Sequence, residues 1–172
     1  RQVQDCVEKG ADLNARDTWE RTPLLLAVQS GDTTKVSYLL GAGANIDDTG
    51  RCNKPALEYA IQMDDANMLS FLIQKGADFE RYNSFGYTSL IQAAEDGAFN
   101  CVKALLNHGA NIYKKDRSQF SQKTAIAHTS SLEIAEALIE AGDDLNQIES
   151  DARDNLLKIG SQEKLAVSKK EY

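Results

Sequence analysis

Gly43-Ala44-Asn45-Ile46 is the stretch of sequence that decides the fold, because close copies of it recur along the whole chain. The copies begin at positions 10, 43, 76, 109 and 142, a constant spacing of 33 residues. A second motif keeps the same spacing and reads TPLLLA at 22–27, PALEYA at 55–60 and TSLIQA at 88–93. Two independent motifs with one period indicate a chain built from repeated structural units.

Each unit is predicted to contain two short helices. Thr22 is typical of a helix N-cap, and Pro23 suits the first helical position because its missing N–H is not needed there. A second apolar pattern, at Val36, Leu39 and Leu40, has the three- and four-residue steps of one helical face. The glycine of each Gly-Ala-Asx group ends this helix. Helices of two to three turns are unstable alone, so the units must stack on one another as a solenoid.

This combination of period, TPLxxA-like starts and Gly-Ala-Asx ends resembles the ankyrin repeat. The resemblance implies an all-α ankyrin-repeat solenoid of stacked helix-turn-helix units with β-hairpin-like finger loops. The sequence departs from the family where ankyrin repeats carry a histidine after TPL. That position holds Leu25, Glu58 and Ile91 here, so we expect the histidine network that links repeats in the family to be absent.

Residues 1–148 are expected to form one ankyrin-repeat domain. It begins with a half repeat at 1–16 and continues with full repeats at 17–49, 50–82, 83–115 and 116–148. A C-terminal capping helix and extension are expected at 149–172, because the last unit of a solenoid must be covered. The sequence opens part-way into a helical pattern and closes on a capping-box signature, Ser168-Lys169-Lys170-Glu171. We therefore expect the chain to be a fragment of something longer.

Two repeats carry local irregularities. In repeat 50–82, Pro55 replaces the capping threonine, so Asn53 is the predicted N-cap. In repeat 116–148, about three extra residues precede Thr124 and about three are missing after it, close to one helical turn. We expect a longer loop followed by an inner helix that is one turn shorter.

Composition narrows the class of function. The chain has 172 residues, of which 42% are hydrophobic and 26% charged, as in ordinary globular domains. A net charge of −7 argues against a nucleic-acid partner, and no apolar run reaches membrane-spanning length. Three cysteines and two histidines show no zinc or disulfide spacing. No phosphate loop or nucleophile motif is present. We expect no catalytic residue, metal or cofactor, and a cytoplasmic location.

The resemblance also predicts where a partner protein binds. In ankyrin repeats the loops and inner helices form a concave face, and contact residues recur at fixed places in each unit. The residues expected to contact a partner are Thr18, Trp19, Arg21, Gln29, Arg51, Lys54, Gln62, Met63, Phe85, Tyr87, Glu95, Asp96, Arg117 and Phe120.

Charge is distributed unevenly over these features. We call the loops at 14–22, 47–55, 80–88 and 113–124 the first to fourth fingers; together they hold nine basic and six acidic residues. The remainder of the chain has a net charge of −10. Acidic residues of this remainder fall on the inner-helix side, at Glu58, Asp64, Asp65, Glu95 and Asp96. The pattern fits an acidic partner at the fingers or a basic partner at the inner helices, and the sequence does not choose between them.

The leading hypothesis is a non-enzymatic protein-protein interaction module, monomeric on its own, that binds a partner through its concave face and fingers. One alternative is a bacterial toxin-neutralising, immunity-type ankyrin protein. A second alternative is a regulatory or substrate-recruiting segment of a larger enzyme.

Overall fold

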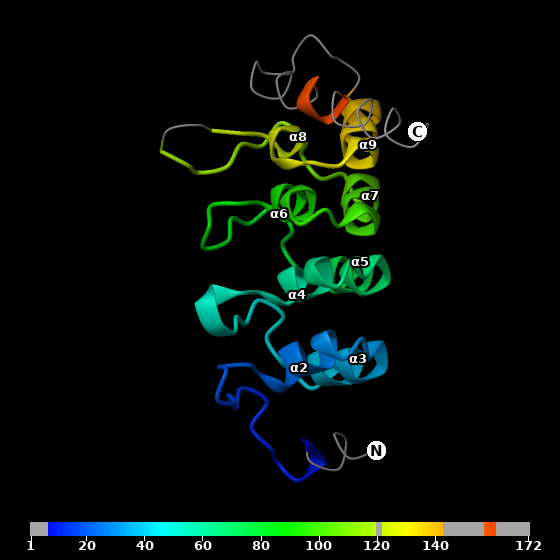
Figure 1. Ribbon diagram of the computed structural model, residues 1–172. Helices are drawn as coiled ribbons and strands as arrows, with labels where there is room; N and C mark the ends of the chain where they lie inside the picture. Colours follow the sequence, from blue (N-terminus) through cyan, green and yellow to red (C-terminus); the bar gives the residue numbers. More distant parts are fainter. Residues whose placement is uncertain (1–6, 120–121, 143–156, 161–172) are drawn as a thin grey trace, which may run out of the picture.

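The computed structural model describes residues 7–119, 122–142 and 157–160. Helices form two columns along a stack, and the finger loops project from the side of the inner column (Figure 1). The inner helices are α2 (Pro23–Gln29), α4 (Ala56–Gln62), α6 (Ser89–Glu95) and α8 (Ala125–His128). The outer helices are α3 (Thr33–Gly41), α5 (Ala66–Gln74), α7 (Phe99–Asn107) and α9 (Leu132–Gly142). The expected all-α solenoid is confirmed.

The described residues contain no β-strand. The second finger holds an isolated bridge between Thr49 and Pro55 and a short 3-10 turn, η1 (Arg51–Asn53). The fingers are therefore hairpin-like in path without forming a sheet.

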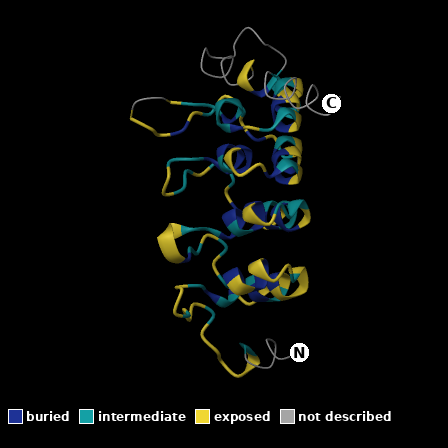
Figure 2. Ribbon diagram, in the orientation of Figure 1, coloured by how far each residue is buried: buried dark blue, intermediate teal, exposed yellow. Residues whose placement is uncertain are grey.

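The core lies between successive repeats and between the two columns of helices (Figure 2). Each inner helix packs on its own outer helix, and α2, α4 and α6 also pack on the inner helix of the next repeat. Leu39, Leu72 and Leu105 hold equivalent positions on α3, α5 and α7 and are all at most 2% exposed. A fully buried leucine contributes about 1.5–3 kcal/mol, so the recurring apolar positions account for the stacking.

Inner helices begin at the same point in each of the first three full repeats. Thr22 and Thr88 accept hydrogen bonds from the backbone N–H groups of Leu25 and Ile91, and Pro23 occupies the first turn as predicted. The prediction for Asn53 is wrong, because Pro55 is the N-cap residue of α4 and no side chain caps that helix. The Asn53 side chain instead accepts a hydrogen bond from the Thr49 hydroxyl at 2.8 Å.

Asp64 caps an outer helix that belongs to the next repeat. It replaces the glycines found at positions 31 and 97 and shares their left-handed backbone, with φ of 47°. The residue before α7 is Ala98, which has no capping side chain. The Asp64 carboxylate accepts from the N–H of Cys101 at 2.9 Å and of Asn100 at 3.3 Å. One side chain therefore satisfies two N–H groups at the start of α7.

Replacing Asp64 with glycine is expected to lower the free energy of unfolding by about 1 kcal/mol, the usual contribution of an N-cap. Glycine keeps the left-handed backbone without strain, so the loss reports the hydrogen bonds of the Asp64 carboxylate, including the one that it accepts from the Asn100 side chain at 2.8 Å. Asp64→Asn retains an acceptor oxygen and serves as the control. Urea unfolding measures both variants. Equal stability of Asp64→Gly and the native chain would show that the cap contributes nothing.

The fourth repeat has the predicted insertion and deletion. Asp17 N–H donates to the Arg21 carbonyl at 3.1 Å, closing the first finger four residues on. The equivalent bond in the fourth finger runs from Asp116 to Lys123 at 2.8 Å, seven residues on. Helix α8 has 4 residues whereas α6 has 7, so the prediction of an inner helix shorter by one turn is confirmed.

Both ends of the stack are described in part. Val7 packs against the hydrophobic core, consistent with a half repeat before residue 17. Within the predicted C-terminal cap only residues 157–160 are described, and they are helical with Ile159 only 5% exposed. The rest of the predicted capping segment lies outside the described residues, and the domain boundaries stay a prediction.

Candidate partner-binding surface

Three of the four fingers have one short polar side chain that bonds to the finger backbone at the same place in the repeat, namely Asp17, Asn83 and Asp116. The Asp17 Oδ1 atom accepts from the N–H groups of Trp19 at 2.9 Å and Arg21 at 2.8 Å. Asn83 does the same in the third finger for Phe85 and Tyr87, both at 2.9 Å. Such Asx turns fix the backbone locally. The loops that carry the predicted aromatic contacts are therefore held in a defined conformation.

The second finger has Gly50 in place of this polar side chain. A Cβ atom at Gly50 would lie 2.7 Å from the hydroxyl of Tyr59, which fills the space. Without an Asx turn the chain forms η1, and Cys52 and Asn53 take left-handed backbone angles with φ of 60° and 58°. The Tyr59 hydroxyl thus leaves no room at position 50 for the side chain that forms the Asx turn in the other fingers.

Hydrogen bonds link each finger to the next. Arg16 donates to the Thr49 carbonyl at 2.6 Å, which joins the first finger to the second. The Ser84 hydroxyl donates to the Cys52 carbonyl at 3.0 Å. Tyr82 donates to the carbonyl of Lys115 at 3.1 Å. These contacts arrange the four loops as one connected surface before any partner binds, which lowers the entropic cost of binding.

The first finger presents a tryptophan on a fixed arginine. The Trp19 side chain is 57% exposed, and the Arg21 guanidinium lies 4.8 Å from its ring centroid. Arg21 also pairs with Asp17 at 2.7 Å and donates to the Gln29 amide oxygen at 2.7 Å. The hydrogen bond from the Arg21 side chain lowers the pKa of Asp17. Thr18 is exposed beside this group.

The second finger and α4 carry a mixed polar surface. Arg51 and Gln62 are exposed and Met63 is 48% exposed. Lys54 is half-buried, and its ammonium lies 4.5 Å from the ring centroid of Tyr59. Burial lowers the pKa of Lys54, and the carboxylate of Glu58 opposes that shift. Of the candidates in this repeat, Lys54 is the least accessible.

The third finger combines an exposed and a packed aromatic ring. Phe85 is 68% exposed, while Tyr87 is half-buried and packs on the core. The Tyr87 ring meets the His128 ring edge-on with 4.8 Å between centroids. Tyr87 therefore also packs between repeats. Glu95 and Asp96 are exposed at the end of α6.

The fourth finger offers an arginine held against an aromatic ring. The Arg117 guanidinium lies 4.1 Å from the ring centroid of Tyr82, and the Arg117 N–H donates to the Gly86 carbonyl at 3.0 Å. Arg117 remains exposed. The last predicted contact residue, Phe120, lies outside the described residues.

The predicted acidic face of the inner helices is smaller than the sequence indicated. Asp65 caps its own helix by accepting from the N–H of Met68 at 2.9 Å, and Asp64 caps α7. Glu58 is only 9% exposed and belongs to the interior. Its sequence neighbours gave no sign of burial. Its equivalents Leu25 and Ile91 are core residues, and comparing these three positions is the signal that finds it.

His128 is the second residue whose role sequence reasoning did not resolve. Its Nδ1 atom lies 2.8 Å from a carboxylate oxygen of Glu95, and its Nε2 atom lies 2.8 Å from a carboxylate oxygen of Asp116. The His128 side chain is 9% exposed and that of Asp116 is 3% exposed. This group joins α6, the fourth finger and α8. A histidine link between repeats is therefore present, one residue after the position that carries histidine in the family motif.

Comparison with known proteins identifies the family of these stacked units. A family model described as ankyrin repeats (3 copies) matches residues 2–83 and 79–149. The chain belongs to the ankyrin-repeat family. This ankyrin-repeat chain is also similar to Protein lin-12 of Caenorhabditis elegans, with 46% identity over 44 residues. Those residues make up 26% of this chain and 3% of the lin-12 protein, so the chain spans a small part of that relative.

Ankyrin repeats are generally protein-protein interaction modules. In the part of the ankyrin-repeat chain that the structure describes, no cluster of three or more histidine, cysteine, aspartate or glutamate residues could hold a metal ion. None of the helices among the described residues is long and apolar enough to cross a membrane.

Proposed function

We propose that this ankyrin-repeat chain is a non-enzymatic module that binds a partner protein through its fingers and the adjoining ends of its inner helices. The observation that carries the proposal is the pair Trp19 and Phe85, which are 57% and 68% exposed on fingers held by Asx turns. Large aromatic side chains dominate the energetics of protein interfaces. Exposing them on a pre-arranged surface favours binding over stability.

Charge favours a partner that brings acidic groups to the finger tips. Arg51, Arg81 and Arg117 are exposed there, and the Arg117 guanidinium already stacks on Tyr82. Arginine in such settings suits carboxylates because its donors form a planar fork. Complementary charge of this kind sets the encounter rate and the choice of partner more than the affinity. We further propose a cytoplasmic location and a monomeric state in the absence of the partner.

Replacing either Trp19 or Phe85 with alanine is expected to weaken partner binding by about tenfold, corresponding to loss of a contact worth more than 1 kcal/mol. The partner is captured from native cells on the immobilised chain and identified by mass spectrometry. Its affinity for each variant is then measured by titration calorimetry. Both side chains are exposed, so circular dichroism and thermal unfolding should stay unchanged.

Tyr38→Ala is the matched control, because Tyr38 lies on the outer helix α3, in the column away from the fingers (Figure 1). It should bind the partner as the native chain does. If both finger variants retain native affinity for every captured protein, the fingers are not the binding surface and the proposal fails.

A further inference from the structure

Glu58 occupies a position that the other repeats fill with aliphatic side chains. It lies on α4, and its equivalents on α2 and α6 are Leu25 and Ile91. Those two residues are 0% and 1% exposed, and Glu58 itself is 9% exposed. A carboxyl group has therefore been placed at a core position between stacked repeats.

The Glu58 carboxyl group is incompletely paired. The side chain of Asn83 lies near enough to act against the rise in the pKa of Glu58, but the amide nitrogen of Asn83 donates to Gln92. The Oε1 atom of Glu58 is buried without a hydrogen-bond partner among the described residues. Lys54 is near enough to influence Glu58 electrostatically, but its ammonium stacks on the ring of Tyr59 at 4.5 Å. Burial raises the pKa of Glu58. Buried carboxylates are normally paired because leaving them unpaired is costly.

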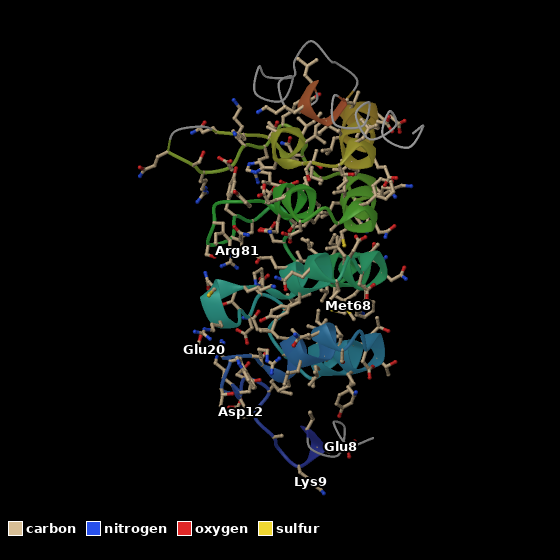
Figure 3. All side chains as sticks on the ribbon, in the orientation of Figure 1. Glu8, Lys9, Asp12, Glu20, Met68 and Arg81 are labelled. Carbon is tan, nitrogen blue, oxygen red and sulfur yellow. The ribbon has the colours of Figure 1, made fainter. Side chains whose placement is uncertain are left out.

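A small cleft adjoins this carboxyl group. It lies between the second finger with α4 and the third finger with α6, and it has about 40 Å³ of space for water-sized molecules. Asp47, Glu58 and Asp78 line it, and Arg81 is the single basic residue among its lining residues. Figure 3 shows Arg81 on the third finger, on the side facing the second finger. The lining therefore favours a cation.

We propose that this cleft is a subsite for one cationic side chain of the bound partner, a lysine or an arginine, with Glu58 as its acceptor. The inference rests on the proposed function, since the cleft opens between two of the fingers that form the binding surface. An ammonium group has three donors and no acceptor, so from the cleft it can donate to the carboxyl group of Glu58, which is one of the lining residues. It is close to water in size, and one water needs about 10–15 Å³ of such space.

The position of Glu58 within the repeat supports this role. A leucine or isoleucine fits the same site in the repeats on either side, so the fold itself does not require a carboxyl group there. Local departures from packing rules are expected at functional sites, where binding rather than stability determines the residue. The subsite would bind a basic group of a partner that also brings acidic groups to the finger tips. A partner must then match both charges, which makes recognition more selective.

The test is a titration of the chain carrying ¹³C-labelled glutamate side chains, followed by NMR. The probes are Nα-acetyl-lysine methylamide and Nα-acetyl-arginine methylamide, with the neutral Nα,Nε-diacetyl-lysine methylamide as the reference. At least one cationic probe should shift the Glu58 carboxyl resonance saturably at millimolar concentration, and the neutral probe should not. The Glu58 resonance is assigned by its loss in Glu58→Gln. Equal shifts with the neutral probe, or no shift with either cation, would overturn the subsite.

Measurements with the captured partner separate this inference from the proposed function. Glu58→Gln and Glu58→Leu should each weaken binding of the partner by at least tenfold. Glu133→Gln should not, because Glu133 is exposed on α9. Glu58→Leu copies the neighbouring repeats and is expected to fold. If Trp19→Ala weakens the partner and neither Glu58 variant does, the binding surface stands and the subsite is wrong. If a cationic probe binds at Glu58 but Trp19→Ala and Phe85→Ala bind the partner with native affinity, the subsite is supported and the fingers are not the binding surface.

Discussion

Glu58→Leu is expected to raise the free energy of unfolding by about 1–3 kcal/mol, the cost of burying a polar group without its hydrogen bonds. Leucine already fills the equivalent position 25, where it is 0% exposed. The substitution removes an unpaired carboxyl group and restores the apolar contact between repeats. Urea unfolding at neutral pH measures the gain. The same variant is expected to lose partner affinity, so stability and binding should change in opposite directions.

The gain in the free energy of unfolding of Glu58→Leu should depend on pH, because burial raises the pKa of Glu58 above its ordinary value of 4.5. The folded chain then holds the Glu58 proton more tightly than the unfolded chain does. Stability of the native protein therefore falls as the pH rises from about 4.5 through the raised pKa. Leucine has no proton to lose. The advantage of Glu58→Leu should be smallest below pH 4.5 and largest above the raised pKa.

Glu133→Leu provides the matched control. Glu133 is exposed on α9, and a surface substitution usually changes stability by no more than about 0.5 kcal/mol. A Glu58→Leu variant that is less stable than the native chain at neutral pH would show that the carboxyl group is well satisfied inside the fold.

His128→Ala is expected to lower the free energy of unfolding by about 1–3 kcal/mol, because it leaves the buried carboxylate of Asp116 without one of its hydrogen-bond partners. The carboxylate of Asp116 is 3% exposed and lies 2.8 Å from the His128 Nε2 atom. Tyr87 would also lose the ring that it packs against. Thermal unfolding should show the loss, and hydrogen exchange should rise first in α8 and the fourth finger.

The loss of stability in acid provides a second test of the contact between His128 and Asp116. Burial acts to raise the pKa of Asp116, but hydrogen bonds from Ser118 and His128 outweigh it, so the pKa lies below the ordinary value of 3.8. The stability that Asp116 contributes is present above pH 3.8 and is lost as the pH falls through the lowered pKa. His128→Ala removes one cause of the lowering, so its stability should fall less steeply in acid.

The control is the chain's other histidine, His108, the C-cap residue of α7. Replacing His108 with alanine should leave stability within about 0.5 kcal/mol of the native value. If His108→Ala and His128→Ala lower the free energy of unfolding equally, the contact of His128 between the third and fourth full repeats does not stabilise the fold.

Much of the architecture could be predicted because the same sequence signals occur in several successive repeats. The period of 33 residues, the threonine caps and the glycine stops each depend on local backbone chemistry, which acts within a few residues. The insertion in the fourth finger was predictable for the same reason. Asp116 keeps the place in the repeat that Asp17 has, and the carbonyl that closes the finger is displaced by the insertion to Lys123. Local signals therefore gave the helices and their order.

The errors arose where a side chain bonds to a partner other than the helix or turn next to it, either within its finger or in the adjoining repeat. Asn53 was expected to cap α4, but the local bridge of the second finger uses its side chain with Thr49. Asp64 was expected among the acidic residues on the inner-helix side, yet it accepts from the N–H of Asn100, 36 residues further on, at the start of α7. Nothing near Glu58 in the sequence indicates that its carboxyl group is buried. Partners brought together by stacking are invisible to patterns read along the chain.

The hydrogen bonds between fingers, such as the one from Arg16 to the Thr49 carbonyl, connect neighbours only. In a solenoid each repeat contacts just the repeats beside it. Strain imposed on one finger by a docked protein therefore passes to the adjacent finger and fades beyond it. Two ligands that engage opposite ends of the stack can occupy it at once with little influence on each other, while two that meet at neighbouring fingers will compete or cooperate.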